Sequence, residues 1–187
     1  AARQGYGVHS REAAIFLAQT ATLARLRGDT SASRALTDTA QRIVDSIPDI
    51  NSQVRIGIAI ASLNDLWSRR QFPAADELAH RVLARTEEQQ DPLALATAAA
   101  YAGLASVYDE QLPRAERDFR RGLAACSGYV DLGAMCRVLK RQLAVTLGTM
   151  GRQEEADSIF GTLPRAEADQ GRAVLAANLA NAARRPR

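Results

Sequence analysis

The chain has 187 residues, of which 47% are hydrophobic, 24% are charged and 5% are aromatic, and its formal net charge is +3. This is ordinary globular composition, and the length fits one domain or one short array. No run is long and apolar enough to span a bilayer, and the arginines are mixed with acidic residues, so neither a membrane span nor specific nucleic-acid binding is expected.

The N-terminal part predicts a loop followed by two helices. Residues 1–9 hold two glycines and no apolar period, and we expect a flexible lead-in. Ser10 is a good N-cap for a helix over residues 11–27. Gly28 ends that helix, and Ser31 is expected to cap the next one.

Prolines mark the starts of the helices in the middle of the chain. A third helix is expected at residues 51–70. Pro73 stands where the first turn of a fourth helix should begin, a position where its missing N–H costs nothing. Asp91 and Pro92 together open the fifth helix, and Pro113 begins the sixth.

Three further helices are expected before the C-terminus. The seventh covers residues 131–150 and ends at Gly151, the eighth covers 153–162, and the ninth covers 165–183, before a basic tail at 184–187. No segment shows the alternating β-branched pattern of a strand. The sequence therefore predicts an all-α fold.

The helices are expected to form antiparallel pairs joined by short turns. One pair of this length cannot bury its own apolar face, so about three or more stacked pairs are needed for stability. The predicted organisation is four helical hairpins and a closing helix, at residues 10–48, 51–90, 91–127, 131–164 and 165–183.

Two stretches of the chain, forty residues apart, can be aligned without a gap and share Gln, Pro, Ala, Arg, Leu and Ala at corresponding positions. They are residues 71–84, QFPAADELAHRVLA, and residues 111–124, QLPRAERDFRRGLA. A third relative carries Gly151, Ala156 and Phe160 at matching steps. The pattern resembles the tetratricopeptide repeat, in a long-helix variant with a period of about 40 residues, as in kinesin light chains and the sensor regions of bacterial transcription activators. The resemblance implies a right-handed α-α superhelix.

Small residues are expected where the paired helices cross, because larger side chains would force the helices apart. The alignment assigns these crossings to alanines at intervals of 43, 40 and 41 residues, namely Ala32, Ala75, Ala115 and Ala156.

In arrays of this family, the first helix of each pair lines a continuous concave groove. Charges of both signs in such a groove suit a peptide or protein segment better than a polyanion. Counting along the aligned helices places these residues in or beside it: Thr22, Arg25, Asn64, Asp65, Ser68, Ser106, Asp109, Arg141 and Val145.

The sequence shows no catalytic constellation. His9 lies in the lead-in, and His80 is expected on a solvated helix face. No zinc-protease motif, phosphate-binding glycine loop or nucleophile elbow occurs. We therefore expect no enzyme activity, no cofactor and no metal site.

Cys126 and Cys136 are the only cysteines, and their spacing matches no metal or redox motif. Free thiols in a reducing compartment are the favoured interpretation, which goes with a cytoplasmic location. A disulfide between neighbouring helices is the alternative. Because the chain begins with Ala-Ala-Arg, we expect a processed chain or a piece of a longer protein.

The leading functional hypothesis is a non-enzymatic scaffold that binds a protein or peptide partner in the groove. The alternative is a ligand- or peptide-sensing domain of a larger bacterial signalling or transcription-regulatory protein. Homo-oligomers could also form, because repeat arrays expose apolar end faces unless these are capped.

Overall fold

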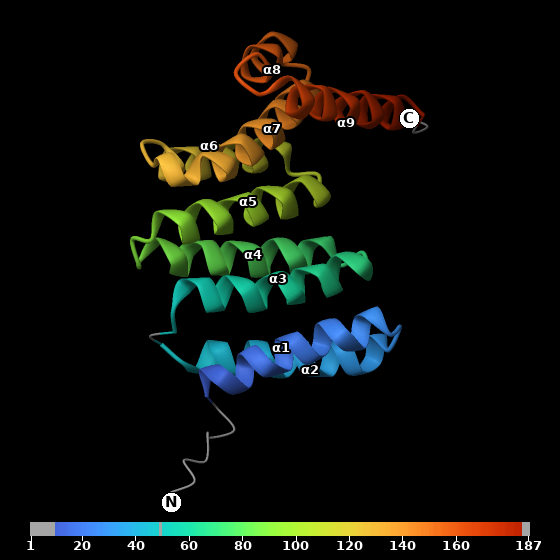
Figure 1. The fold of residues 1–187 in the computed structure, drawn as a ribbon. Coiled ribbons are helices and arrows are strands. Elements are labelled where there is room, and N and C mark those ends of the chain that lie inside the picture. Colours follow the sequence, from blue (N-terminus) through green and yellow to red (C-terminus); the bar gives the residue numbers. More distant parts are fainter. Residues whose placement is uncertain (1–9, 49, 185–187) are drawn as a thin grey trace, which may run out of the picture. The chain divides into compact units, whose positions relative to one another are not determined.

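The computed structural model describes residues 10–48 and 50–184. Within these ranges every regular element is helical, which confirms the all-α prediction (Figure 1). The lead-in at residues 1–9 and all of the basic tail except Arg184 lie outside the described residues. The elements are α1 (Arg11–Leu26), α2 (Thr30–Ser46), α3 (Ser52–Ser68), α4 (Phe72–Glu87), α5 (Pro92–Tyr108), α6 (Leu112–Cys126), a 3-10 turn η1 (Val130–Leu132), α7 (Gly133–Thr149), α8 (Gln153–Phe160) and α9 (Arg165–Ala183).

The chain divides into two compact units, residues 1–94 and residues 95–187. The division falls in the first turn of α5, close to the predicted boundary between the second and third hairpins. Each unit therefore holds two of the four predicted hairpins, and the second unit also holds α9.

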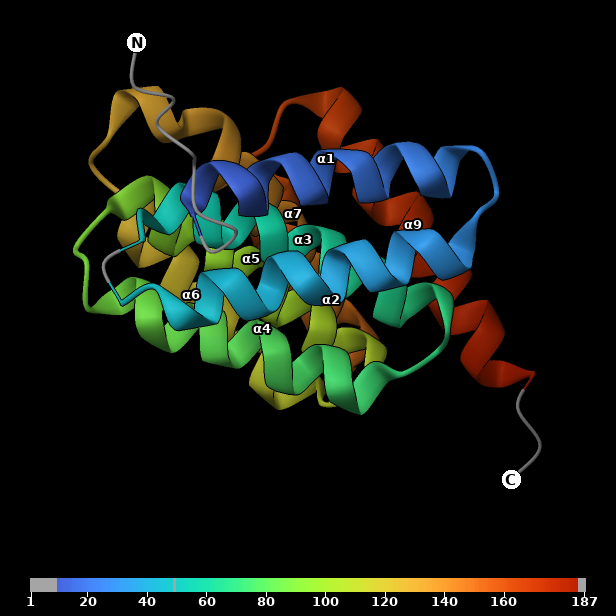
Figure 2. The same ribbon diagram turned by 90° about the horizontal axis from the view of Figure 1, so that it is seen from below.

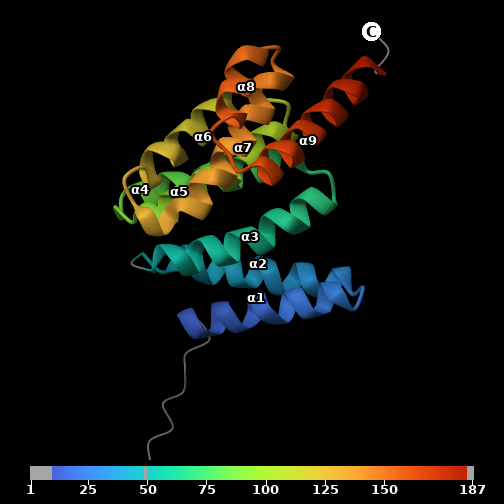
Figure 3. The ribbon, with the colours of Figure 1, turned by 45° about the horizontal axis from the view of Figure 1, so that its top comes forward.

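In the first unit, neighbouring helices pack against each other in chain order. Helix α1 lies along α2, α2 packs on α3, and α3 packs on α4 (Figures 2 and 3). Helix α1 also contacts α3, as first helices of successive repeats should. Small and β-branched side chains fill the space between α1, α2 and α3, and the buried members of this cluster are Ala14, Ala40, Ile43, Val44, Ile50 and Ile58.

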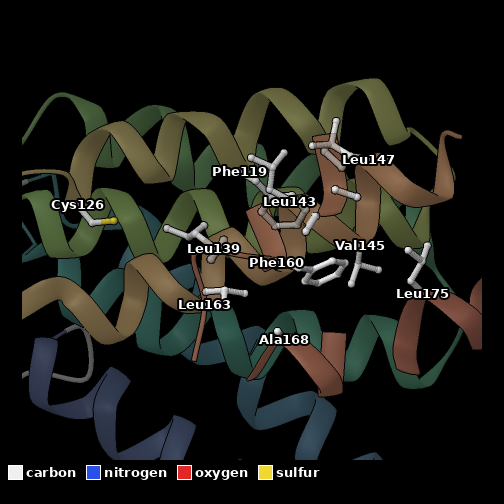
Figure 4. Packing of buried hydrophobic residues seen from close by; sticks show 14 of the residues in the cluster. Phe119, Cys126, Leu139, Leu143, Val145, Leu147, Phe160, Leu163, Ala168 and Leu175 are labelled. Atoms are coloured by element: carbon white, nitrogen blue, oxygen red, sulfur yellow. The ribbon is translucent and has the colours of Figure 1, made fainter. Parts of the chain in front are cut away.

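In the second unit, α7 is the central helix and contacts α6, α8 and α9. Its residues Leu139, Leu143 and Leu147 are fully buried, together with Phe119 of α6 and Phe160 of α8 (Figure 4). Each such side chain contributes about 1.5–3 kcal/mol when it is removed from water. The core of this unit therefore joins both of its hairpins and the C-terminal helix.

The same backbone turn joins the two helices of every hairpin. The second residue after the first helix of each pair has a positive φ, and these residues are Gly28 (82°), Arg70 (59°), Glu110 (61°) and Gly151 (83°). In each turn, the N–H of the next residue donates to a carbonyl five residues earlier, at 2.8–3.0 Å. This is the Schellman arrangement that satisfies the last carbonyls of a helix. It recurs at intervals of 42, 40 and 41 residues, so the repeat is present in the backbone.

The start of α2 differs from the prediction by two residues. Asp29, and not Ser31, is the N-cap, and its Oδ1 accepts a hydrogen bond from the N–H of Ala32 at 2.9 Å. The buried crossing residue of this helix is consequently Ser33, because Ala32 is only half-buried. Ser33 stands five residues after Gly28, as Ala75, Ala115 and Ala156 stand after the other three turn residues. All three alanines are fully buried, as predicted.

The two cysteines form a disulfide, so the favoured expectation of free thiols is wrong. Cys126 ends α6 and Cys136 lies in the first turn of α7, with their Cα atoms 5.9 Å apart. The intervening η1 turn brings the two helix ends together. Free thiols had supported the predicted cytoplasmic location, whereas disulfides persist mainly in oxidising compartments. The cytoplasmic location therefore stays a prediction and no longer has the support of free thiols. No helix in the described ranges is both long and apolar enough to cross a membrane.

Candidate functional site

The predicted groove residues of the first unit lie on the surfaces of α1 and α3. Thr22 and Arg25 are exposed on α1, and Asn64 and Ser68 are exposed on α3. Asp65 is half-buried; it is paired with Arg69 and accepts, through its carbonyl, a 2.7 Å hydrogen bond from the Ser68 hydroxyl. The structure thus brings Asp65 and Ser68 together, and leaves this polar face of α3 accessible.

In the second unit, Ser106 does not face a groove. It is fully buried, and its Oγ lies 3.5 Å from Oδ2 of Asp118, which is itself buried on α6. Ser106 therefore lies on the α6 side of α5, so the alignment placed it on the wrong face. Asp109 and Arg141 are half-buried, and Nη1 of Arg141 donates to Oε1 of Gln170 at 2.6 Å.

Val145 is also buried, contrary to its placement in the groove. It is 7% exposed and belongs to the core cluster of this unit, among Phe160 and Leu175 (Figure 4). The reason is that α9 packs on α7. Leu175 of α9 approaches Gly148 of α7 so closely that a Cβ built on this glycine would lie 2.9 Å from Leu175 Cδ1. The capping helix thus covers the face of α7 that was expected to bind a partner, and the mid-helix Gly148 was the sequence signal for it.

A groove is present between α1 and α3 in the first unit. Its volume is about 250 Å³, and its lining is mainly apolar. Thr22, one of the predicted groove residues, lies at its edge, and its hydroxyl donates to the carbonyl of Ala18. Four lining residues come from each helix, namely Ile15, Ala18, Gln19 and Thr22 from α1, and Val54, Gly57, Ile58 and Ala61 from α3.

Gly57 keeps this groove open. It is exposed in the interior of α3, and a Cβ built on it would meet no atom within 4 Å. A glycine in a helix interior costs about 1 kcal/mol relative to alanine. No close packing of helices requires that cost here, in contrast to Gly148. The open space at Gly57 therefore comes at a cost in helix stability. The sequence analysis did not single out Gly57.

Helix α1 also exposes large apolar side chains. Phe16 is 67% exposed, and Leu23 and Leu26 are exposed as well. Their spacing of seven and three residues puts them on one stripe of the helix. Large apolar side chains exposed together on one helix are typical of sites that contact another protein.

The one histidine in the described part of the chain lies on α4. His80 is not solvated as expected, because its Nδ1 lies 2.8 Å from the carbonyl oxygen of Asp76 and 3.3 Å from Asp76 Oδ1. Both side chains are largely buried one turn apart on α4. In the described part of the chain, no group of three or more His, Cys, Asp and Glu side chains could hold a metal ion. His9 lies outside the described residues.

The sequence matches no model of a known protein family, and no curated protein shows significant similarity to it. The tetratricopeptide resemblance thus stays a prediction from the repeat pattern.

Proposed function

We propose that the chain is a non-enzymatic, tetratricopeptide-like scaffold, and that the α1–α3 groove binds a peptide segment of a partner protein. The observation that carries this proposal is Gly57, an exposed glycine in a helix interior on the floor of an apolar groove. Its cost in helix stability has a reason if the groove must admit a side chain from another molecule. Stability given up for function in this way is common in natural proteins.

A peptide suits the groove better than a small cofactor does. Pockets for drug-sized ligands have volumes of about 300–1,000 Å³, whereas the volume of this groove, about 250 Å³, lies below that range. Gln19 and Thr22 supply polar groups at its edge. Phe16 and Leu23, on the same helix but outside the lining, are further exposed apolar side chains that a partner could contact. An apolar centre with a polar rim is the usual anatomy of a protein interface.

Peptide display on the purified chain tests this proposal. A library is selected on the wild-type protein, and individual peptides are then measured against Gly57→Leu, which fills the groove. Ala35→Leu is the matched control, because it adds the same side chain at an exposed position of α2 outside the groove. We expect a loss of affinity of about tenfold or more in Gly57→Leu, from removal of a buried apolar side chain, and no loss in Ala35→Leu.

Two outcomes would contradict peptide binding in the α1–α3 groove. Selected peptides that bind wild type and Gly57→Leu with equal affinity would place the binding surface elsewhere. A selection that yields no binder, from a protein shown to be folded by circular dichroism, would count against a peptide scaffold.

A second candidate is the ligand-sensing domain of a larger signalling or regulatory protein. The observation that favours it is a separate, arginine-lined cavity in the first unit, to which α2, α3 and α4 contribute residues and α1 contributes none. The two sites share no lining residue, so the two functions can be tested independently.

A further inference from the structure

A cavity of about 340 Å³ lies among α2, α3 and α4 in the first unit. Arg55 of α3 and Arg81 and Arg85 of α4 contribute to its lining, and α2 contributes Gln41 and Asp45. Three guanidinium groups and one carboxylate thus meet at one small cavity. Its volume falls in the range of pockets that bind small molecules.

Arg55 is the unusual member of this set. Only 3% of its surface is exposed, yet its Nε and Nη1 atoms are buried without an acceptor among the described residues. Its Nη2 has only two long hydrogen bonds, each 3.4 Å, to the carbonyl oxygens of Ile47 and Pro48. A guanidinium has five N–H donors, so three of them lack an acceptor. Leaving a buried charged group in this condition is strongly unfavourable.

Among the described residues, the nearby carboxylates form no ion pair with Arg55. Asp45 pairs instead with Arg85, at 3.7 Å, and Glu77 pairs with Arg81, at 2.9 Å. Burial, and after it the charge of Arg85, lower the pKa of Arg55 below its usual value, although Asp45 and Glu88 act in the opposite direction. Counting the described residues, the cavity is therefore short of negative charge at Arg55, its most buried guanidinium.

We propose that this cavity binds the carboxylate or phosphate group of a small molecule, with Arg55 at its floor and Arg85 at its mouth. The planar guanidinium presents N–H groups in a fork that fits either oxyanion. The oxyanion would accept the hydrogen bonds that Arg55 otherwise lacks. Leu78 and Val82, which also line the cavity, would contact the apolar part of the same molecule. The inference is independent of peptide binding in the α1–α3 groove.

The test uses inorganic phosphate and citrate as probes, with sodium chloride adjusted to constant ionic strength. A ligand that binds only the folded state raises its stability with concentration. We expect both probes, or one of them, to raise the melting temperature of the wild type above that in chloride alone. Titration calorimetry then gives the affinity, and the comparison of the two probes distinguishes a phosphate site from a carboxylate site.

Two variants tie the effect to the cavity. Arg55→Met keeps the volume and removes the charge, and it should weaken binding of the preferred probe about 10- to 100-fold, as expected for loss of hydrogen bonds to a charged group. Arg85→Gln changes a half-exposed residue at the mouth, so we expect it to fold even if Arg55→Met does not, and it should weaken binding by a smaller factor. Gly57→Leu should bind the probe like wild type, which keeps the outcome separate from that of the peptide groove.

Two results would overturn the proposal. One is a wild-type protein that responds to phosphate and citrate no more than to chloride. The other is binding that persists unchanged in both arginine variants.

Discussion

Replacement of Gly103 by alanine should destabilise the second unit, although alanine is the better helix former. A Cβ built on Gly103 would lie 2.6 Å from Cδ1 and 2.7 Å from Cζ of the Phe119 ring, and closer still to Cε1. Phe119 is fully buried, so the ring has no free space to enter. Overpacking of a core costs about 1–3 kcal/mol, and a clash with a confined ring belongs at the upper end. The higher helix propensity of alanine offsets about 1 kcal/mol of this cost. The free energy of unfolding should therefore fall by about 2 kcal/mol.

The assay is equilibrium denaturation in urea, followed by far-ultraviolet circular dichroism. Gly57→Ala is the matched control, because Gly57 is also in a helix interior but has open space above it. It should gain about 1 kcal/mol from helix propensity alone. Trp67, the only tryptophan, lies in the same helix and reports this gain by fluorescence. The two glycine substitutions should therefore change stability in opposite directions.

A double-mutant cycle isolates the cause. In a Phe119→Leu background the ring is absent, so Gly103→Ala should change from destabilising to stabilising. A coupling of this kind between contacting residues is the signature of a direct packing interaction. If Gly103→Ala is as stable as Gly57→Ala, or if its effect is the same with and without the ring, the close approach of α5 and α6 is refuted.

Three further predictions concern the turns, the disulfide and an ion pair. Arg70→Gly should stabilise the chain by about 0.5–1 kcal/mol in urea denaturation, because a non-glycine residue at φ 59° is strained. A loss of stability would contradict the positive φ of Arg70 in this turn. Reduction of the Cys126–Cys136 disulfide should lower the free energy of unfolding by about 3 kcal/mol, because the unfolded chain gains loop entropy. The stability of Cys126→Ser should not change with reductant. If the stability of the wild type does not change either, the disulfide is contradicted. Arg152 donates to Glu155 at 2.6 and 2.7 Å and lowers the pKa of that carboxyl. The stability from this pair should be present above the unfolded pKa, near 4.3, and be lost as pH falls through the lower folded pKa. A carboxyl NMR titration that is unchanged in Arg152→Ala would refute this.

The helices and their pairing could be predicted because their signals are local. Pro73, Pro113 and Gly151 each act within one turn of the residues they affect, and each marks a helix boundary found in the structure. The error of one residue at Ser33 was avoidable on the same grounds. Gly28 and Gly151 occupy the same turn position, and the helix cap follows each of them directly. Counting from the glycine, and not from the most plausible capping side chain, gives the correct register.

The buried positions of Ser106 and Val145 could not be derived in the same way. Each depends on which neighbouring helix covers a given face, and that is a tertiary property. Val145 is covered because α9 packs on α7. The disulfide is of the same kind, since the 5.9 Å between the Cα atoms of Cys126 and Cys136 depends on the path of the η1 turn.

The glycines inside the helices fall into two groups, those that helix packing explains and Gly57, which it does not explain. Gly103, Gly122, Gly148 and Gly171 each leave room for a side chain of a neighbouring helix, since an added Cβ would collide with Phe119, Leu139, Leu175 or Phe160. Helix packing thus accounts for all four. Gly57 has the same cost in helix propensity, but no residue of the described chain uses the space above it. Because each of the four buried glycines has a partner side chain and Gly57 has none, Gly57 is the observation that supports the proposed binding of a side chain from another molecule.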